Sequence, residues 1–271
     1  MVDISTIDYS RFDRPEILMT LFHPRPEWPI SEGVREGTDI LIPVETDVVV
    51  GGRLHVSRKS NPNILFFHGN GEIVADYDDL GSLYVRSDMN FLPVDYRGYG
   101  RSTGTPTITN MMRDAHVIFD HILRWLSEKG YEGPLIAMGR SLGSASALEL
   151  AAHYGDQIDG LVIESGFAYA SPLLELLGIN MKVLGLREEE GFSNLEKIRC
   201  FAKPTLIIHA EQDHIIPFSE GQALYEASPA RRKRFLMIRG ANHNDIFLKG
   251  MGEYMRAVKG LSVDVSCRND G

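Results

Sequence analysis

Residues 134–152 read PLIAMGRSLGSASALELAA. The apolar run up to Met138 predicts a buried strand, and the small-residue run that begins at Ser144 predicts a helix. Between them lies the pattern Gly-x-Ser-x-Gly, with Ser141 at its centre. A strand that turns this sharply into a helix strains its central residue, and the two glycines let the crowded chains pass. We therefore expect the Ser141 hydroxyl to stand exposed at the end of a strand, beside the first N–H groups of a helix.

Two later strand ends carry the side chains that such a serine needs. Residues 204–209 (PTLIIH) form an apolar run, and Asp213 lies in the loop behind it. Residues 234–239 (RFLMIR) form the next run, and His243 lies in the loop that follows. A serine hydroxyl is a poor nucleophile until an imidazole accepts its proton, and a carboxylate fixes the tautomer of that imidazole. The predicted catalytic residues are therefore Ser141, Asp213 and His243.

Each partner of the serine has alternatives. Asp213 is also placed to cap the turn before the next helix, and His243 could be an ordinary surface-loop residue. Glu164 is an alternative acid because it too ends an apolar run. His214, beside the aspartate, and His209, within a predicted strand, are alternative bases. The order Ser, Asp, His at three strand ends favours the first assignment.

A further component of the predicted site precedes the serine in the chain. Residues 63–72 read NILFFHGNGE, which predicts a strand, a glycine-bearing turn and then a helix. Attack on an acyl carbonyl places negative charge on its oxygen, and two backbone N–H donors stabilise that charge. We assign the N–H groups of Leu142 and Asn70 to this oxyanion hole, with Gly71 as the alternative second donor. His68 is expected to be structural.

Three segments give the chain a resemblance to a known family. They are residues 95–102 (DYRGYGRS), 139–143 (GRSLG) and 240–245 (GANHND). Over about residues 48–258 the chain resembles an alpha/beta-hydrolase-fold serine hydrolase of the compact subgroup that includes palmitoyl-protein thioesterases and lysophospholipid or monoacylglycerol lipases. The resemblance implies hydrolysis of an ester or thioester. It also implies a catalytic triad at Ser141, Asp213 and His243.

Predicted strands and helices alternate along the rest of the chain. Residues 109–128 carry apolar side chains at helical spacing, and residues 246–258 predict a closing helix. Strands separated by helices favour an α/β fold, the alpha/beta-hydrolase fold, with a mostly parallel sheet covered by helices on both faces. The predicted strands begin near Ile64, Phe91, Leu135, Leu161, Thr205 and Phe235.

Two segments lie outside this alternation. Residues 1–45 are expected to be an N-terminal arm that packs on a hydrolase domain of residues 46–271. Residues 48–56 predict a hairpin that turns at Gly51 and Gly52, because apolar residues flank this pair.

Residues 165–200 are expected to form a short cap on the hydrolase domain. Their first half is strongly apolar and would suit an acyl chain if it faced the site. The alternative is an amphipathic connecting helix that packs on the core. The candidate substrate-lining residues are Leu173, Leu174, Leu177 and Met181.

Composition narrows the classes of function. The chain has 271 residues, 43% of them hydrophobic, so it can bury one large core. A formal net charge of -9 argues against a nucleic-acid partner, and the basic cluster at residues 231–234 is typical of a solvated turn. Cys200 and Cys267 predict neither a disulfide framework nor a zinc site. No apolar run approaches the roughly 20 residues of a membrane span. Because the start of the chain also lacks the features of a signal peptide, a cytoplasmic location is expected.

The sequence therefore predicts a serine hydrolase that acts on a small-molecule ester or thioester and needs no cofactor and no metal. A serine peptidase for small peptides is one alternative, since it shares the same machinery and residues 188–190 (EEE) offer charge for a substrate amine. A non-catalytic binding protein that retains the fold is the other. The physiological substrate, the acyl-chain length and the oligomeric state are not predicted.

Overall fold

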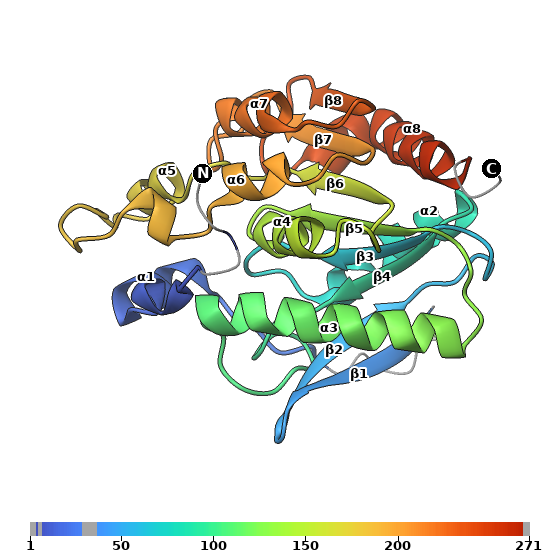
Figure 1. Cartoon of the computed structure of the whole chain (residues 1–271), viewed down its shortest axis with the longest axis horizontal. Coiled ribbons are helices and arrows are strands. Elements are labelled where there is room, and N and C mark those ends of the chain that lie inside the picture. Colours follow the sequence, from blue (N-terminus) through green and yellow to red (C-terminus); the bar gives the residue numbers. More distant parts are fainter. Residues whose placement is uncertain (1–3, 5–6, 29–36, 268–271) are drawn as a thin grey trace.

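The computed structural model describes residue 4 and residues 7–28 and 37–267. Its strands form one sheet in the order β1-β2-β4-β3-β5-β6-β7-β8, listed here with their bounds: β1 (Thr38–Glu45), β2 (Val48–Leu54), β3 (Asn63–Phe67), β4 (Asn90–Val94), β5 (Leu135–Arg140), β6 (Gly160–Glu164), β7 (Thr205–Ala210) and β8 (Lys233–Ile238). β1 and β2 pair antiparallel, as do β2 and β4, and every pair from β4 across to β8 is parallel (Figure 1). The prediction of a mostly parallel sheet is confirmed.

Helices cover both faces of this sheet. The helices of the described residues are α1 (Pro15–Leu21), α2 (Asp78–Arg86), α3 (Ile108–Glu128), α4 (Gly143–His153), α5 (Ala170–Leu176), α6 (Asn194–Arg199), α7 (Phe218–Ala227) and α8 (Ile246–Ser266), with the 3-10 helices η2 (Tyr9–Phe12), η3 (Val74–Tyr77) and η4 (Glu188–Glu190). α3, α4, α6 and α7 lie on one face, and α2 and α8 lie on the other (Figure 1). The buried side chains of the two groups belong to two separate core clusters.

β5 shows why the predicted strands are continuous apolar runs in the sequence. Leu135 and Ala137 belong to the core on the face of α3 and α4, whereas Ile136 and Met138 belong to the core on the face of α2 and α8. Successive side chains of a strand point to opposite faces, so a strand that is covered on both sides must be apolar at every position.

The two longest helices, α3 and α8, match their predicted segments at one end and extend beyond them at the other. α3 begins one residue before the predicted segment 109–128 and ends with it. α8 extends beyond the predicted residue 258 to Ser266, because Leu261 and Val265 continue its buried face.

The predicted hairpin turn at Gly51 and Gly52 is wrong. The hairpin joins β1 to β2 through a turn at residues 46–47, and both glycines lie inside β2. A Cβ on Gly52 would lie 3.2 Å from the main-chain oxygen of Pro93 in the neighbouring strand. The glycine therefore allows a close approach of two backbones rather than a turn. β1 also occupies residues 38–45, which the sequence interpretation placed in the arm.

The described part of the N-terminal arm contains η2 and α1, and it packs on the hydrolase core. Phe12, Ile17 and Leu21 are buried within the same cluster as α3 and α4. α1 and the segment around α5 project from the same side of the molecule (Figure 1). Arg11 of η2 links the N-terminal arm to the segment that follows α5, since its guanidinium donates to the main-chain oxygen of Gly185 at 3.2 Å. The division into arm and domain stays a prediction.

Candidate active site

Ser141 lies in the turn between β5 and α4 and has a left-handed backbone conformation, with a φ of 51°. A Cβ on Gly139 would lie 2.2 Å from the main-chain oxygen of Gly143, and a Cβ on Gly143 would lie 2.1 Å from the main-chain oxygen of Phe67. Backbone atoms cannot move aside as a flexible side chain can, so only glycine fits at either position. The local sequence thus produces the strained strand-to-helix elbow that was expected.

The imidazole of His243 lies between the other two predicted catalytic residues. Its Nε2 is 3.0 Å from the Ser141 Oγ, and its Nδ1 is 2.7 Å from the Asp213 Oδ2. Asp213 and His243 are buried, and Ser141 is partly exposed. When the Nδ1–H is donated to the carboxylate, Nε2 is free to accept the serine proton.

The second oxygen of Asp213 is also bound. Its Oδ1 accepts the main-chain N–H groups of Ile215 at 3.0 Å and of Ile216 at 2.8 Å. Burial alone would raise the pKa of this carboxyl, but the hydrogen bond and charge of His243 and the amide of Ile216 outweigh burial and lower the pKa. Asp213 therefore remains an ionised acceptor for the imidazole.

The alternative residues occupy other positions. Glu164 accepts hydrogen bonds from the Arg140 guanidinium at 3.1 Å and from the Tyr254 hydroxyl at 2.7 Å, on the side of α8. His209 is buried, with its Nε2 2.9 Å from the main-chain oxygen of Ile216, and burial lowers its pKa. His214 is exposed. The structure therefore brings Asp213, and not Glu164, to the ring of the histidine that faces the serine.

The turn between β3 and η3, residues 68–73, contains the predicted oxyanion donor Asn70 and is named the oxyanion loop for that prediction. The side-chain Oδ1 of Asn70 accepts the His23 main-chain N–H and the Tyr99 hydroxyl, both at 2.8 Å. Arg25 donates to the Gly71 main-chain oxygen at 2.7 Å. The N-terminal arm thus supports the loop from outside.

The two main-chain N–H groups predicted to form the oxyanion hole, those of Asn70 and Leu142, have no acceptor among the described residues. Leu142 directly precedes the first turn of α4. His68 is fully buried, with its Nδ1 2.8 Å from the Gly69 main-chain oxygen and its Nε2 3.3 Å from an Asp95 carboxylate oxygen. These contacts agree with a structural histidine.

The four candidate substrate-lining residues of the cap are not equally accessible. Leu173, Leu174 and Met181 are buried in the core cluster that includes α3 and α4, and Leu177 is partly buried against that cluster. Their packing favours the connecting-helix alternative most strongly for Leu174, which is 0% exposed. A substrate-lining role stays a prediction for all four.

A second cluster of titratable side chains includes two residues of α4 that follow Ser141 in the chain, Glu149 and His153. One ligand atom each of His116, Glu149 and His153 lie within 4.8 Å of one another, so the group could hold a metal ion. Glu149 is already paired, because Lys197 Nζ and the Tyr9 hydroxyl each lie 2.7 Å from its Oε2. Burial raises the pKa of Glu149, but the charge of Lys197 and several hydrogen bonds lower it to about 2. The cluster, here called the Glu149 node, joins the arm to α3, α4 and α6.

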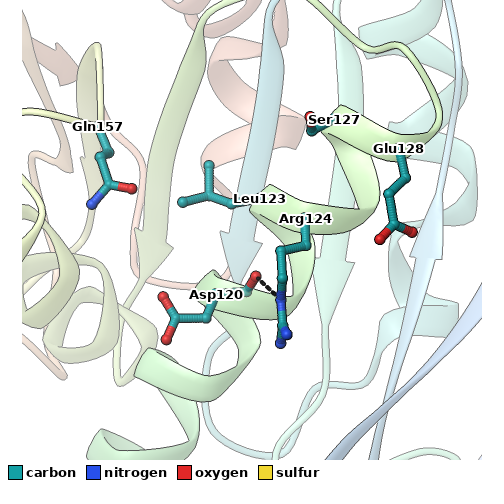
Figure 2. A pocket seen from close by; sticks show the side chains of 6 residues that line it. All are labelled: Asp120, Leu123, Arg124, Ser127, Glu128 and Gln157. Carbon is teal, nitrogen blue, oxygen red and sulfur yellow. Dashed lines mark hydrogen bonds between the residues drawn. The ribbon is translucent and has the colours of Figure 1, made fainter.

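A surface hollow on α3 lies apart from these groups. Figure 2 shows that mostly polar side chains surround it, and the Arg124 Nε donates to the Asp120 main-chain oxygen at 3.2 Å. Such a lining does not suit an acyl chain, for which apolar walls are expected. No predicted site residue lines it; its residues are Asp120, Leu123, Arg124, Ser127, Glu128 and Gln157.

Sequence reasoning missed a buried charge network below the elbow. Arg140 donates to Glu72 at 2.9 Å and to Glu164 at 3.1 Å. A signal for it was present, because Arg140 and Glu164 end two otherwise apolar strands. Charged groups at such positions are seldom buried without a partner.

The fold and the Ser-His-Asp geometry together define the class of protein. The chain belongs to the alpha/beta-hydrolase family, and a hydrolase activity is supported. The family model described as "Serine aminopeptidase, S33" matches residues 58–187.

Individual relatives agree with this class. The chain is similar to alpha/beta hydrolase domain-containing protein 17B of Xenopus tropicalis, with 31% identity over 251 residues, or 87% of this chain and 78% of the relative. The Pyrococcus furiosus esterase Pf2001 has a TM-score of 0.69 at 17% identity, over 88% of this chain and 98% of the esterase. The Paleococcus ferrophilus monoacylglycerol lipase has a TM-score of 0.62 at 19% identity, over 82% of this chain and 100% of the lipase. At these identities the two structures show a shared fold.

Across the described ranges, none of the helices combines the length and the apolar character that crossing a bilayer requires.

Proposed function

We propose that the protein is a serine hydrolase that cleaves carboxylic esters or thioesters through an acyl-enzyme intermediate. The observation that carries the proposal is the placement of His243, with one ring nitrogen 3.0 Å from the Ser141 Oγ and the other 2.7 Å from an Asp213 oxygen. Nucleophile, base and orienting carboxylate are within hydrogen-bonding distance, as acyl transfer requires. No cofactor is needed for these steps.

The first half of the proposed reaction acylates the enzyme. The Ser141 Oγ attacks the carbonyl carbon while His243 Nε2 takes its proton, and the N–H groups of Leu142 and Asn70 hold the negative oxygen. Collapse of this intermediate breaks the bond to the leaving group. The imidazolium returns its proton to that group, which departs as an alcohol or a thiol.

The second half releases the acyl group as an acid. Water attacks the acyl-enzyme carbonyl, and the His243 Nε2 accepts the water proton. The second tetrahedral intermediate then expels the Ser141 oxygen, which regains a proton from the imidazolium. Asp213 stays ionised throughout and stabilises the imidazolium that forms in each half.

The small-molecule acyl substrate is proposed on two grounds. Two proteins with this fold are an esterase from Pyrococcus furiosus and a monoacylglycerol lipase from Paleococcus ferrophilus. The segment expected to form the cap is rich in apolar residues, and Leu177 is only partly buried against the core. A partly buried apolar side chain suits contact with an acyl chain.

A peptidase is the second candidate, favoured by the description of the matching family model. Its expected amine-binding acids are already engaged. Glu188 accepts the main-chain N–H groups of Ala170 at 2.6 Å and Ser171 at 2.9 Å, and so caps α5. Glu190 pairs with Arg187 at 3.0 Å. This use of the acidic side chains favours ester or thioester cleavage over aminopeptidase activity.

A panel of substrates separates these candidates. p-Nitrophenyl esters of increasing chain length would be assayed beside acyl-thioesters and aminoacyl-anilides, and a fluorophosphonate would be used as a covalent probe. We expect labelling of the protein and turnover of esters or thioesters. Anilide turnover alone would favour the peptidase, and absence of labelling and of all turnover would favour a non-catalytic binding protein.

A further inference from the structure

Arg140, the residue before Ser141, has a buried guanidinium whose three nitrogens reach three separate parts of the chain. Nε donates to the Glu72 Oε1 at 2.9 Å and Nη1 donates to the Glu164 Oε1 at 3.1 Å. Nη2 donates to the main-chain oxygen of His243 at 3.1 Å. One planar group thus connects the oxyanion loop, the end of β6 and the loop that carries the imidazole.

On the first side, the network continues into the oxyanion loop. The Oε2 of Glu72 accepts the Gly69 main-chain N–H at 2.6 Å, and the Tyr77 hydroxyl donates to the same oxygen. Burial alone would raise the pKa of Glu72, but the charge of Arg140 and the Tyr77 hydroxyl lower it. The ionised carboxylate therefore holds the backbone directly before Asn70, which carries one proposed oxyanion donor.

On the second side, Glu164 connects the network to the elbow itself. Its main-chain oxygen accepts the Ser141 main-chain N–H at 2.9 Å, and its Oε2 accepts the Tyr254 hydroxyl at 2.7 Å. The carboxylate of Glu164 is thus fixed between Arg140 and α8, while its backbone fixes the serine. Movement at either point would move the nucleophile.

The shape of the guanidinium explains why arginine stands at this position. Its N–H groups point in fixed in-plane directions, so it can bond three acceptors at once and hold them at set distances. A lysine ammonium carries the same charge on a flexible stem without the planar fork. A role in charge balance alone would be met by either residue, whereas a role in geometry would be met by arginine only.

We propose that Arg140 is a positioning residue. Through its bonds to His243, Glu164 and Glu72 it fixes the positions of the base, the nucleophile and an oxyanion donor relative to one another. This inference rests on the proposed function for its kinetic consequences. A displacement of about 1 Å in reacting groups can lower a rate by about 10²-fold. The effect should therefore fall on kcat, with little effect on KM, because the Arg140 guanidinium is buried and all three of its nitrogens donate to protein groups.

The test compares Arg140→Lys and Arg140→Gln with a matched arginine variant, Arg97→Lys. Arg97 is also buried and bonds two carboxylates, Asp114 at 2.6 Å and Glu45 at 2.7 Å, which lie outside the site. With p-nitrophenyl esters, both Arg140 variants should lower kcat by about 10- to 100-fold with KM changed by less than about threefold. Arg97→Lys should keep kcat within about twofold even if its melting temperature falls. Wild-type kcat in folded Arg140→Lys would overturn the proposal.

A second measurement does not depend on turnover. The Nδ1–H of His243, bound to Asp213, should give a far-downfield proton NMR signal, assigned by its absence in His243→Gln. The signal should be lost or shifted in Arg140→Lys and in the milder Glu72→Gln, and it should be unchanged in Arg97→Lys. An unchanged signal in both Arg140→Lys and Glu72→Gln would overturn the inference. A wild-type protein that shows the signal but hydrolyses no acyl substrate would instead remove the proposed function and leave the positioning role to be decided by the NMR result.

Discussion

The Nη2 of Arg140 donates to the main-chain oxygen of His243 at 3.1 Å, although the two residues are 103 positions apart in the chain. The residue that precedes Ser141 thus holds the backbone of His243. Together with the 3.0 Å contact between the His243 ring and the Ser141 hydroxyl, this bond fixes the histidine at two points, ring and backbone. The candidate site is therefore built on strand ends that are tied to each other below the surface.

The identity of the acid can be tested by comparing two carboxylates. Asp213→Asn leaves the imidazole without an anionic partner and favours the wrong tautomer, so kcat should fall by about 10²- to 10⁴-fold. Glu164→Gln should lower kcat much less, because Glu164 acts on Arg140 and Tyr254. Steady-state ester hydrolysis by the two variants decides, and the reverse ranking would move the acid to Glu164.

Backbone strain at Ser141 predicts that a glycine at this position is more stable than an alanine. Ser141 has a φ of 51°, which glycine adopts readily and alanine does not. Ser141→Gly should therefore be more stable than Ser141→Ala by about 1 kcal/mol, although both variants lack the serine hydroxyl. Urea denaturation of the two proteins measures this difference. Equal unfolding free energies would mean that the elbow is not strained.

The Glu149 node predicts a pH-dependent contribution to stability. The folded-state pKa of Glu149 is lowered to about 2, below the usual value of about 4.3, so the unfolded chain binds more protons in this interval. The contribution of Glu149 should be complete above about pH 5 and should be lost as the pH falls toward 2.

The matching experiment compares the wild type with Glu149→Gln by thermal or urea unfolding across that range. Near pH 7 the variant should be less stable by about 3 kcal/mol, because Lys197 is left buried without its partner. The gap should narrow as the pH is lowered. A gap of constant size from pH 7 to pH 3 would show that the charge of Glu149 does not stabilise the fold.

Two leucines of the cap should respond differently to truncation. Leu174 is 0% exposed within the core cluster, so Leu174→Ala should lower the unfolding free energy by about 2 to 5 kcal/mol. Leu177 is only partly buried, so Leu177→Ala should mainly alter the preference for acyl-chain length, at about 0.8 kcal/mol for each methylene bound. Melting temperatures and kcat/KM from acetate to decanoate esters would be measured for both. An unchanged chain-length profile in Leu177→Ala would exclude that residue from the acyl site.

The parts of the fold that could be predicted from the sequence depend on local patterns. The apolar run before Ser141 and the glycines around it specify a strand, a turn and a helix within ten or so residues, so their meaning does not depend on the rest of the chain. Asp213 and His243 were recognised because each follows an apolar run, and parallel strands place their carboxyl ends at one edge of the sheet.

The parts that could not be predicted depend on which strands become neighbours. Gly51 and Gly52 look like a turn in sequence, but they lie within β2, where Gly52 meets the backbone of β4. The bonds of Arg140 to Glu72 and to Glu164 join residues 68 and 24 positions away. No periodicity in one segment shows that a charge in another will lie beside it.

We assign Ser141 as the nucleophile, and covalent labelling with a fluorophosphonate followed by peptide mass spectrometry tests this claim. One adduct should form on wild-type protein, on the peptide that contains Ser141. Ser141→Ala should fold, lose the adduct and lower kcat for ester hydrolysis by about 10³-fold or more. An adduct on another residue, or wild-type turnover in Ser141→Ala, would contradict the claim.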